Sequence, residues 1–484
     1  MNLQSKHYDL ANSLLVDVQM GRRATLNQKV RTLLTEEAKL EKLWGGVARL
    51  SLVVGEVTLA RECAEKYHNS LGTDESLLQY AGLLAESGST AEAYSLISNS
   101  SSLSDGFSVS YLRGVCCSQL GHFKSAKVHF KEALGYSNVS GSAWLGLASI
   151  SEEEELISII EDLNELIQSK AFKEPKEQVQ ALYAISKANE MIGDVEAAFN
   201  FTELAANIAK KSFVNDKYEV GVESALTNKI MEFHNDDYFK HSPKQDVFDD
   251  FRPIFVIGLP RTGTTLISET LGKHTEIGSG GELNITKLSL LPVGIQQLYN
   301  SKEDKENRKI INEILRNFRN EYVYRAKLKV TESIVVDKTL DLYRYVGLLS
   351  DAFPNAHFIY MQREEKNVAW SCYKHFYSSG LPWTYSLPEI KHFIDDHNEM
   401  MNYWLKQIPE RFTVVSYEKF VQTPDKVIAG ILNTLNLEKG DLSFDTEIAP
   451  GTIMTNSLLH ARKPISDKFI NTTESIKSKL DIFK

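Results

Sequence analysis

The sequence lacks the features that mark membrane-spanning, secreted and nucleic-acid-binding chains. It contains no run of about 18 uninterrupted apolar residues, so we expect no membrane span. Its first residues show no basic start followed by an apolar core, so we expect no signal peptide and a cytoplasmic location. The formal net charge of −10 at pH 7 argues against broad nucleic-acid binding, and we expect no nucleic-acid partner.

Cysteine is also scarce. The four cysteines are Cys63, Cys116, Cys117 and Cys372, and no two of them have the C-x-x-C spacing. So few cysteines in 484 residues do not make a disulfide framework, and we expect buried reduced thiols. The length argues for more than one domain, and 42% hydrophobic residues are enough for a core in each.

Residues 1–240 have the pattern of a helical repeat domain. Three apolar helical segments each end in a glycine at intervals of 33 residues, and an alanine follows five positions later: Gly55 and Ala60, Gly88 and Ala93, Gly121 and Ala126. This resembles tetratricopeptide repeats, in which the glycine ends the first helix and the small residue lets the second helix pack closely. A further unit follows Gly193, whereas 144–163 has helical composition without the turn glycine. The alternative is an unrelated helical bundle.

Residues 241–484 have a different pattern. The polar stretch 228–252 is interpreted as the connection between the two domains. After it, short β-branched runs at 254–257, 333–336, 357–361 and 412–416 alternate with amphipathic helical segments. This alternation predicts parallel strands with crossover helices and a ligand site at the carboxyl ends of the strands. The expected fold is therefore an all-α repeat domain followed by an α/β domain with a parallel sheet.

The first expected strand runs into a loop that nearly matches the phosphate-binding P-loop. Gly258 and Gly263 have the spacing of Gly-x-x-x-x-Gly-Lys-Ser/Thr, but Thr264 stands in the place of the lysine and the cation is Arg261. The loop amides and the positive end of the following helix still suit an anion. Without the lysine the loop is less suited to a magnesium-bound nucleoside triphosphate. A nucleotide kinase or ATPase is therefore the disfavoured alternative.

Cations also follow two of the other expected strands. Lys338 ends the second strand, and Arg363 ends the third, with Ser371 two turns into the next helix. A P-loop hydrolase usually places a carboxylate at such a strand end to hold Mg²⁺, and Asp337 is the only comparable acid. We therefore expect a site that neutralises a polyanion with protein cations and without a metal.

These motifs together resemble the sulfotransferases that use 3′-phosphoadenosine 5′-phosphosulfate (PAPS). The resemblance rests on 260–266, Gly281-Glu282, Asp337-Lys338 and Arg363 with Ser371, and it covers roughly 253–484. The arginine-led loop with a downstream Gly-Glu resembles the protein-tyrosine sulfotransferases. The helical repeats ahead of it resemble the bacterial tetratricopeptide-repeat sulfotransferases.

The resemblance implies a function and partners. The chain would move the sulfuryl group of PAPS to an acceptor hydroxyl, with protein tyrosine as one candidate acceptor. A peptide or protein would dock on the repeats, or the repeats would only brace the catalytic domain or form a homodimer. A repeat scaffold with an inactive sulfotransferase domain is the remaining alternative.

The resemblance also implies roles for single residues. Glu282 would be the general base, Lys338 would stabilise the leaving group, and Arg261 would act beside them. The loop would hold the 5′-phosphosulfate, while Arg363 and Ser371 would hold the 3′-phosphate. The implied donor-binding residues are Arg261, Thr262, Gly263, Thr264, Thr265, Arg363, Ser371, Tyr417, Ser457 and Lys468, the last two from a C-terminal segment that resembles the one closing over the nucleotide.

The chain departs from the tyrosine sulfotransferases at one point of the site. They carry paired glutamates after the glycine, whereas this chain has Gly281-Glu282-Leu283, so one carboxylate carries over. None of the nearby histidines has the position of the catalytic histidine in other sulfotransferases; we interpret His274 as a helix-end residue and His357 as strand packing. The aromatic stretch 376–385 either lines the acceptor pocket or belongs to the core.

Overall fold

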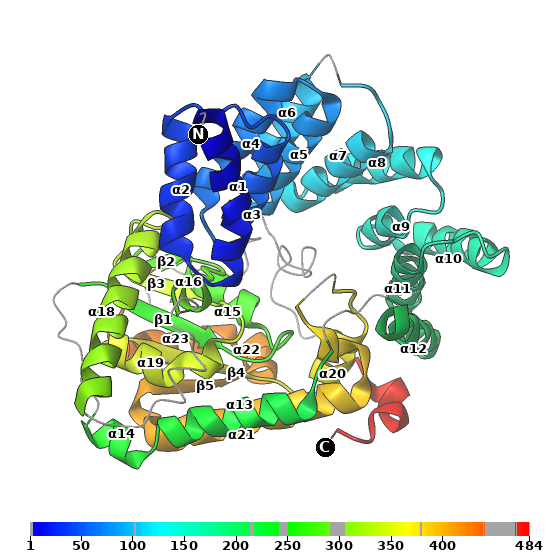
Figure 1. The fold of residues 1–484 in the computed structure, drawn as a ribbon. Coiled ribbons are helices and arrows are strands. Elements are labelled where there is room, and N and C mark those ends of the chain that lie inside the picture. The colour runs from blue at the N-terminus through cyan, green and yellow to red at the C-terminus, as the bar shows by residue number, and fades with distance from the viewer. Residues whose placement is uncertain are drawn as a thin grey trace. The chain divides into compact units, whose positions relative to one another are not determined.

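The computed structural model describes residues 3–100, 103–212, 217–241, 250–290, 305–377, 380–438, 440, 470 and 472–483. Contacts divide the described chain into two compact units, one ending at Ile192 and one beginning at Gly193 (Figure 1). The sequence pattern instead predicts a domain boundary at 240/241, which stays a prediction. None of the helices in the described ranges combines the length and the apolar character needed to cross a bilayer.

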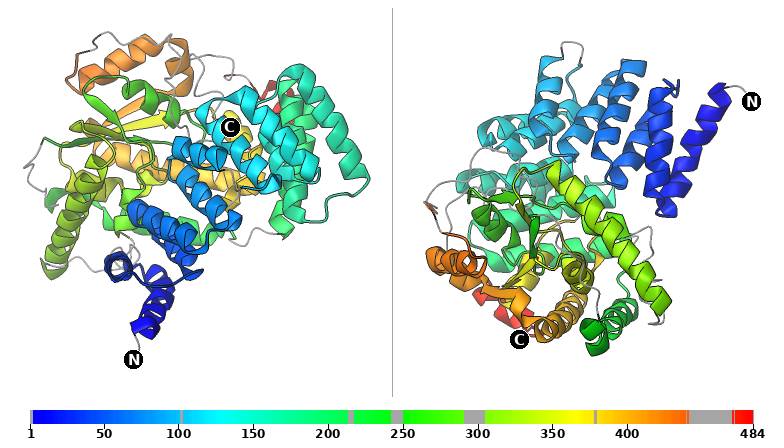
Figure 2. Two further views of the ribbon diagram at one scale, coloured as in Figure 1. Left: turned by 90° about the horizontal axis from the view of Figure 1, so that it is seen from above. Right: turned by 90° about the vertical axis from the view of Figure 1, so that its left-hand side faces the viewer.

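The first unit is built from helices over its described residues. Many of them run side by side (Figure 2). The helices are α1 (Leu3–Gln19), α2 (Arg23–Thr35), α3 (Leu43–Val53), α4 (Val57–Leu71), α5 (Asp74–Glu86), α6 (Thr90–Asn99), α7 (Phe107–Leu120), α8 (Phe123–Tyr136), α9 (Gly141–Ala148), α10 (Glu153–Gln168) and α11 (Pro175–Met191). The predicted all-helical character of the N-terminal region is confirmed.

The repeated glycines lie at the turns between paired helices. Gly55, Gly88 and Gly121 separate α3 from α4, α5 from α6 and α7 from α8, and their φ angles are 74°, 89° and 84°. Such left-handed φ angles favour glycine because a Cβ atom would strain the backbone. The alanines five positions later, Ala60, Ala93 and Ala126, are fully buried. The helix–turn–helix units are therefore observed, while their assignment to the tetratricopeptide family stays a prediction.

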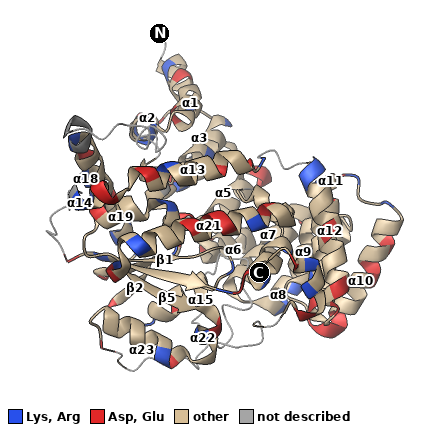
Figure 3. Ribbon diagram, turned by 90° about the horizontal axis from the view of Figure 1, so that it is seen from below, with Lys and Arg blue, Asp and Glu red and all other residues tan. Residues whose placement is uncertain are grey.

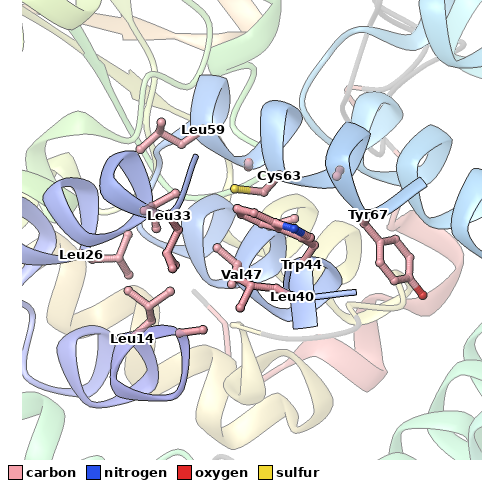
Figure 4. Packing of buried hydrophobic residues seen from close by; sticks show 14 of the residues in the cluster. Leu14, Leu26, Leu33, Leu40, Trp44, Val47, Leu59, Cys63 and Tyr67 are labelled. Carbon is pink, nitrogen blue, oxygen red and sulfur yellow. The ribbon is translucent and has the colours of Figure 1, made fainter. Parts of the chain in front are cut away.

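Large apolar side chains of α1 to α4 form the core at the start of the first unit. Figure 4 shows Leu14, Leu26 and Leu33 facing Trp44 and Cys63. The indole of Trp44 is buried and donates a hydrogen bond to the carbonyl of Ala38 (3.2 Å), which satisfies its polar atom. Burial of each such side chain stabilises the fold by about 1.5–3 kcal/mol. All four cysteines lie in the described part of the chain, are buried, and form no disulfide, as expected.

The second unit contains the sheet. Its helices and strands, over the described residues, are α12 (Val195–Ser212), α13 (Val220–Phe233), α14 (Asp236–His241), β1 (Arg252–Ile257), α15 (Thr264–Leu271), β2 (Ile277–Ser279), α16 (Ile285–Leu290), α18 (Lys305–Lys327), β3 (Ile334–Asp337), α19 (Val346–Ala352), β4 (His357–Gln362), α20 (Glu365–Tyr373), α21 (Leu387–Gln407), β5 (Phe412–Ser416), α22 (Tyr417–Gln422) and α23 (Pro424–Thr434). Short 3₁₀ helices are η2 (Leu342–Tyr345), η3 (Pro382–Tyr385), η4 (Pro409–Arg411) and η5 (Glu474–Leu480).

The described strands form one parallel sheet in the order β2-β3-β1-β4-β5. Strand β1 is central: Phe255 pairs with Asp337 of β3 on one side and with Phe358 of β4 on the other. The four predicted strands are all present, and the parallel α/β sheet is confirmed. Strand β2, only three residues long, was not predicted.

The two faces of the sheet bury different kinds of side chain. On one face, Ile254 and Val256 pack in an aliphatic cluster with residues of α15, α22 and α23. On the other, Phe255 meets an aromatic cluster that includes Tyr322 of α18 and Phe353 beside α19, with ring centroids 5.9 and 6.1 Å away. Because successive side chains of a strand point to opposite faces, both faces are covered and the strands read as apolar runs.

The stretch 228–252 is not an irregular connection over its described first part. Residues 228–233 belong to α13 and 236–241 form α14. His234 is fully buried between the rings of Phe233, Tyr238 and Trp404. Helix α14 also bonds to α21, where Gln407 Nε2 donates to a carboxylate oxygen of Asp236 (3.0 Å). The polar residues that resembled a linker are therefore partners of α21.

Acidic residues, red in the ribbon of Figure 3, occur along several helices of both units. Helix α10 is an example, since its first turn contains Glu153, Glu154 and Glu155. Negative charge near a helix start interacts favourably with the helix dipole. The formal net charge of −10 is thus compatible with a locally cationic site elsewhere.

Candidate anion-binding and transfer site

The loop after β1 has a backbone path that depends on two glycines. Gly263 precedes the first residue of α15 and has a φ of 93°, and Arg261 also has a positive φ of 74°. A Cβ atom on Gly258 would lie 2.6 Å from Thr262 Oγ1 and 2.9 Å from the carbonyl oxygen of Met361. The loop therefore turns tightly against β4 and delivers Thr264 and Thr265 as the first two residues of α15. Backbone amides at a helix start suit an anion.

The side chain of Tyr417 packs against this loop. A Cβ atom on Gly263 would meet Tyr417 Cδ2 at 2.6 Å, so the tyrosine ring lies directly against the glycine. The guanidinium of Arg363 lies over the same ring, with 4.4 Å from Cζ to the centroid. Burial raises the pKa of Tyr417, and the neighbouring charges of Arg363 and Arg261 oppose that rise. The ring therefore contacts two of the predicted donor-binding residues at once.

Hydrogen bonds join Arg261 to the helix after β4 and join Arg363 to Arg261. Arg261 Nε donates to Ser371 Oγ (2.9 Å), and Arg363 Nη1 donates to the carbonyl oxygen of Arg261 (2.9 Å). Burial is the main cause that lowers the pKa of Arg363, and the charge of Arg261 lowers it further. Two cations held this close in a half-buried position are electrostatically favoured when an anion neutralises them.

Glu282 and Lys338 form an ion pair on the other side of the loop. Lys338 Nζ donates to Glu282 Oε1 at 2.8 Å, and the exposed fractions of the two side chains are 5% and 40%. Glu282 follows Gly281, whose φ is 62°, and Lys338 is the first residue after β3. The amide of Lys338 donates to the carbonyl of Gly281 (2.9 Å), which brings the two segments together. The lysine is therefore buried with a carboxylate partner rather than solvated in a loop.

The strand order explains why these groups share one edge of the sheet. Because β1 lies between β3 and β4, the loop after β1 is flanked by Lys338 at the end of β3 and Arg363 after β4. The chain leaves β1 toward β2 and β3 on one side and then crosses to β4 on the other. Ligands of open α/β sheets bind at such a switch of direction, outside the carboxyl ends of the strands (Figure 1).

The structure thus brings most of the predicted site residues into two groups. Arg261, Gly263, Arg363, Ser371 and Tyr417 form one contact network, and Glu282 pairs with Lys338. Thr262 differs from the other predicted loop residues, because its side chain is buried and donates to the carbonyl of Leu259 (2.7 Å). Ser457 and Lys468 lie outside the described residues.

Sequence reasoning missed several residues beside the ion pair. Tyr322 and Thr339 both donate to the carboxylate of Asp337, and Glu269 accepts from Ser279 Oγ (3.3 Å). Burial raises the pKa of Glu269, and the charge of Lys338 opposes that rise. A threonine directly after Asp337-Lys338 is a signal that local sequence could have provided. Tyr322 is an ordinary aromatic residue of a helix, and no local pattern distinguishes it.

His274 lies just after a helix, whereas His357 and Trp383 are core residues. His274 follows α15, accepts from the amide of Glu276 (3.1 Å) and contacts the carbonyl of Glu438 (2.8 Å). His357 begins β4 and is buried against Thr413 Oγ1 (2.8 Å). Trp383 stacks on Phe393 with 4.0 Å between ring centroids, so this part of 376–385 belongs to the core.

The described residues form a parallel α/β domain in which a glycine-containing loop without the P-loop lysine lies near a carboxylate–lysine pair at the carboxyl ends of the strands. Residues 253–441, which include the described sheet apart from Arg252 at the start of β1, match the sequence model of the sulfotransferase family. This part of the chain is therefore similar in sequence to the sulfotransferase family.

One curated relative and several solved structures are similar to the chain. An uncharacterized protein of Aquifex aeolicus is 26% identical over 374 residues, which cover 71% of this chain and 48% of the relative, so the chain spans about half the length of that protein. Sulfotransferase domains from the curacin biosynthetic pathway and from the Synechococcus PCC 7002 olefin synthase are both 17% identical, with TM-scores of 0.33 and 0.34. They cover 47% and 48% of this chain, and the matches span 96% and 91% of those domains. Because these TM-scores are low, we draw no conclusion from the structural similarity. The similarity to the sulfotransferase family is based on the sequence match alone.

Proposed function

We propose that the chain transfers the sulfuryl group of PAPS to a hydroxyl group of an acceptor. The proposal is carried by one observation: a glycine-containing loop without the P-loop lysine is flanked by two strands that are directly followed by Lys338 and Arg363. The match of residues 253–441 to the sulfotransferase family supports the same reaction class.

The loop and the two arginines fit the charges of this donor. The amides at the start of α15, with Arg261, Thr264 and Thr265, would hold the 5′-phosphosulfate. Arg363 and Ser371 would hold the 3′-phosphate, which distinguishes PAPS from ATP. Ser371 Oγ accepts from Arg261, and a hydroxyl that accepts one bond can still donate another to a phosphate oxygen. Because protein cations supply the positive charge, we propose that donor binding needs no metal.

The ion pair supplies the chemistry of transfer. In the proposed step the acceptor oxygen forms a bond to sulfur while the bond from sulfur to the 5′-phosphate oxygen breaks, and 3′,5′-bisphosphoadenosine leaves. Glu282 takes the hydroxyl proton, and Lys338 stabilises the negative charge on the transferring and leaving oxygens. A phenol has a pKa near 10 and a free glutamate one of about 4.3, so the proton must move during sulfuryl transfer rather than before it.

The acceptor we propose to test first is protein tyrosine. The arginine-led loop followed by Gly281-Glu282 resembles the tyrosine-specific members of the family, and the helical units of the first part of the chain are a surface on which a peptide or protein would dock. Bracing of the catalytic domain or formation of a homodimer are the other roles open to these helices.

The test combines a transfer assay with donor binding. The full chain is incubated with radiolabelled PAPS and a cell extract, which is then separated into protein, lipid and small-molecule fractions. We expect label in one fraction, and acid-labile label on tyrosine O-sulfate residues if the acceptor is protein. We also expect calorimetry to show 3′,5′-bisphosphoadenosine binding in EDTA. No labelled fraction together with binding that chelation abolishes would contradict the proposal.

A further inference from the structure

The carboxylate of Asp337 is a buried hub between the two segments that bear the ion pair. Asp337 is fully buried at the end of β3. Its Oδ1 accepts hydrogen bonds from the amide of Thr339 (2.9 Å), the hydroxyl of Thr339 (2.6 Å) and the amide of Leu283 (3.4 Å). Its Oδ2 accepts from the hydroxyl of Tyr322 (2.7 Å). All four contacts are donors, which suits an ionised carboxylate.

The hydrogen bonds to Asp337 come from the residues that directly follow Glu282 and Lys338 in the sequence. Leu283 follows Glu282 and Thr339 follows Lys338, so one carboxylate holds both segments. Thr339 Oγ1 extends the hub, because it also accepts from the amide of Asn284 (2.9 Å). The opposite end of the same turn is held by the amide of Gly280, which donates to the carbonyl of Val336 (2.9 Å). The backbone around Glu282 is therefore attached to β3 at several points.

Tyr322 fixes the hub from the aromatic side of the sheet. It comes from α18, is fully buried, and its ring lies 5.1 Å from that of Phe353 and 5.9 Å from that of Phe255. Burial raises the pKa of Asp337, and the bonds from Thr339, Tyr322 and Leu283 oppose that rise. Burying a carboxylate is costly, and an apolar residue would serve packing alone at lower cost. The charge at this position therefore needs an explanation beyond core packing.

We infer that Asp337, with Thr339 and Tyr322, is a positioning group that holds Glu282 opposite Lys338. The inference rests on the proposed function, because it assigns these residues to the placement of the proposed base and its lysine. Asp337 does not act on the substrate in this scheme. Its four hydrogen-bond donors occupy it within the protein.

The variant that tests the inference is Thr339→Val, with Thr339→Ser as its matched control. Valine keeps the shape of threonine and removes the hydroxyl that bonds to Asp337 and accepts from Asn284. We expect Thr339→Val to lower kcat about 10- to 100-fold, since a small misplacement of a reacting group costs rate in this range. Affinity for 3′,5′-bisphosphoadenosine should stay within about twofold of the wild type, because Thr339 bonds to Asp337 and Asn284 and is not one of the residues assigned to the donor. Thr339→Ser should retain near-normal kcat.

A double variant separates positioning from a general structural role. If Thr339 acts through Glu282, Thr339→Val added to Glu282→Gln should lower kcat by less than about twofold further. An equal loss in both backgrounds would overturn the inference. So would a Thr339→Ser variant as impaired as Thr339→Val.

A crystal structure of Thr339→Val tests the inference without any activity. We expect the distance between Lys338 Nζ and Glu282 Oε1 to exceed 4 Å, and an unchanged ion pair would overturn the inference. A wild type that transfers no sulfuryl group would count against the proposed function alone, since this distance still decides whether the hub positions the pair.

Discussion

The guanidinium of Arg363 stacks over the ring of Tyr417, with 4.4 Å between Cζ and the ring centroid. The same ring lies against Gly263, where a Cβ atom would approach Tyr417 Cδ2 to 2.6 Å. One aromatic side chain therefore contacts both the loop that we propose binds the 5′-phosphosulfate and the arginine that we assign to the 3′-phosphate. We therefore expect donor binding to depend on the ring of Tyr417 more than on its hydroxyl.

Tyr417→Leu should weaken 3′,5′-bisphosphoadenosine binding, whereas Tyr417→Phe should preserve most of it. A cation–π contact contributes about 0.5–2 kcal/mol, so the leucine variant should bind roughly 2- to 30-fold more weakly. Phenylalanine keeps the ring under Arg363 and beside Gly263. Isothermal titration calorimetry measures both. Equal losses in the two variants would mean that the hydroxyl, not the ring, is the important group.

Arg363→Ala should weaken the bisphosphate far more than AMP. Charge-assisted bonds to a phosphate contribute about 1.5–3 kcal/mol, and AMP lacks the 3′-phosphate to which Arg363 is assigned. Arg363→Lys is the matched variant, because it keeps the charge and loses the planar fork, and its affinity should fall in between. Competition binding with both nucleotides measures the ratio. The same loss for AMP as for the bisphosphate would show that Arg363 does not contact the 3′ group.

Glu282→Gln should lower turnover about 10²- to 10⁴-fold, because glutamine keeps the shape and removes the basicity. Donor affinity should change little, since the carboxylate is assigned to the acceptor side. Steady-state kinetics and bisphosphate titration measure the two effects. Glu276→Gln, at an exposed position directly before β2, should leave both unaltered. If turnover and donor affinity fall together, Glu282 is a structural residue of the turn.

The stability of the second unit should fall as the pH is lowered from about 6.5 to about 4. Burial lowers the pKa of His397 to about 4, with the hydrogen bond to Asn398 opposing it. An unfolded histidine has a pKa near 6.5, so between these values the unfolded chain binds more protons and acid favours unfolding. His234 and His357, also at about 4, act in the same direction.

A histidine variant isolates one part of this pH dependence. His397 packs between the rings of Tyr343 and Tyr360, so His397→Phe is a packing-compatible replacement. The difference in unfolding free energy between pH 7 and pH 5, from urea titration, should shrink by about 2 kcal/mol in the variant. His122→Gln, at an exposed position, is the control and should leave the difference unchanged. An unchanged difference in His397→Phe would mean that His397 is not buried as a neutral side chain.

The strands and the loop could be predicted because each is marked by a pattern within a short segment of the sequence. Buried parallel strands are apolar runs, and the expected 254–257, 357–361 and 412–416 differ little from β1, β4 and β5. The loop likewise depends on glycines at set spacing, and Gly263 does adopt the positive φ that such a loop requires. Strand β2 escaped prediction because three residues carry too little periodicity to distinguish a strand from a turn.

Residues 228–241 were misinterpreted because their partners lie far along the chain. Asp236 accepts a hydrogen bond from Gln407, and His234 fits beside Gly347, where a Cβ atom would come within 2.2 Å of the histidine ring. A polar residue bonded inside a protein and one facing solvent look alike in sequence. Only the packing of α13 against α21 distinguishes them.

By itself, the sequence determined the helical units, the parallel sheet and the residue types at each strand end, because periodicity, glycine spacing and strand-end charge are properties of neighbouring residues. Only the tertiary structure decided that Lys338 meets Glu282 and that Asp337 is held by Tyr322. Those contacts depend on the strand order β2-β3-β1-β4-β5, which sets which strand ends are adjacent. The strand order results from the packing of the whole unit, so no local pattern encodes it.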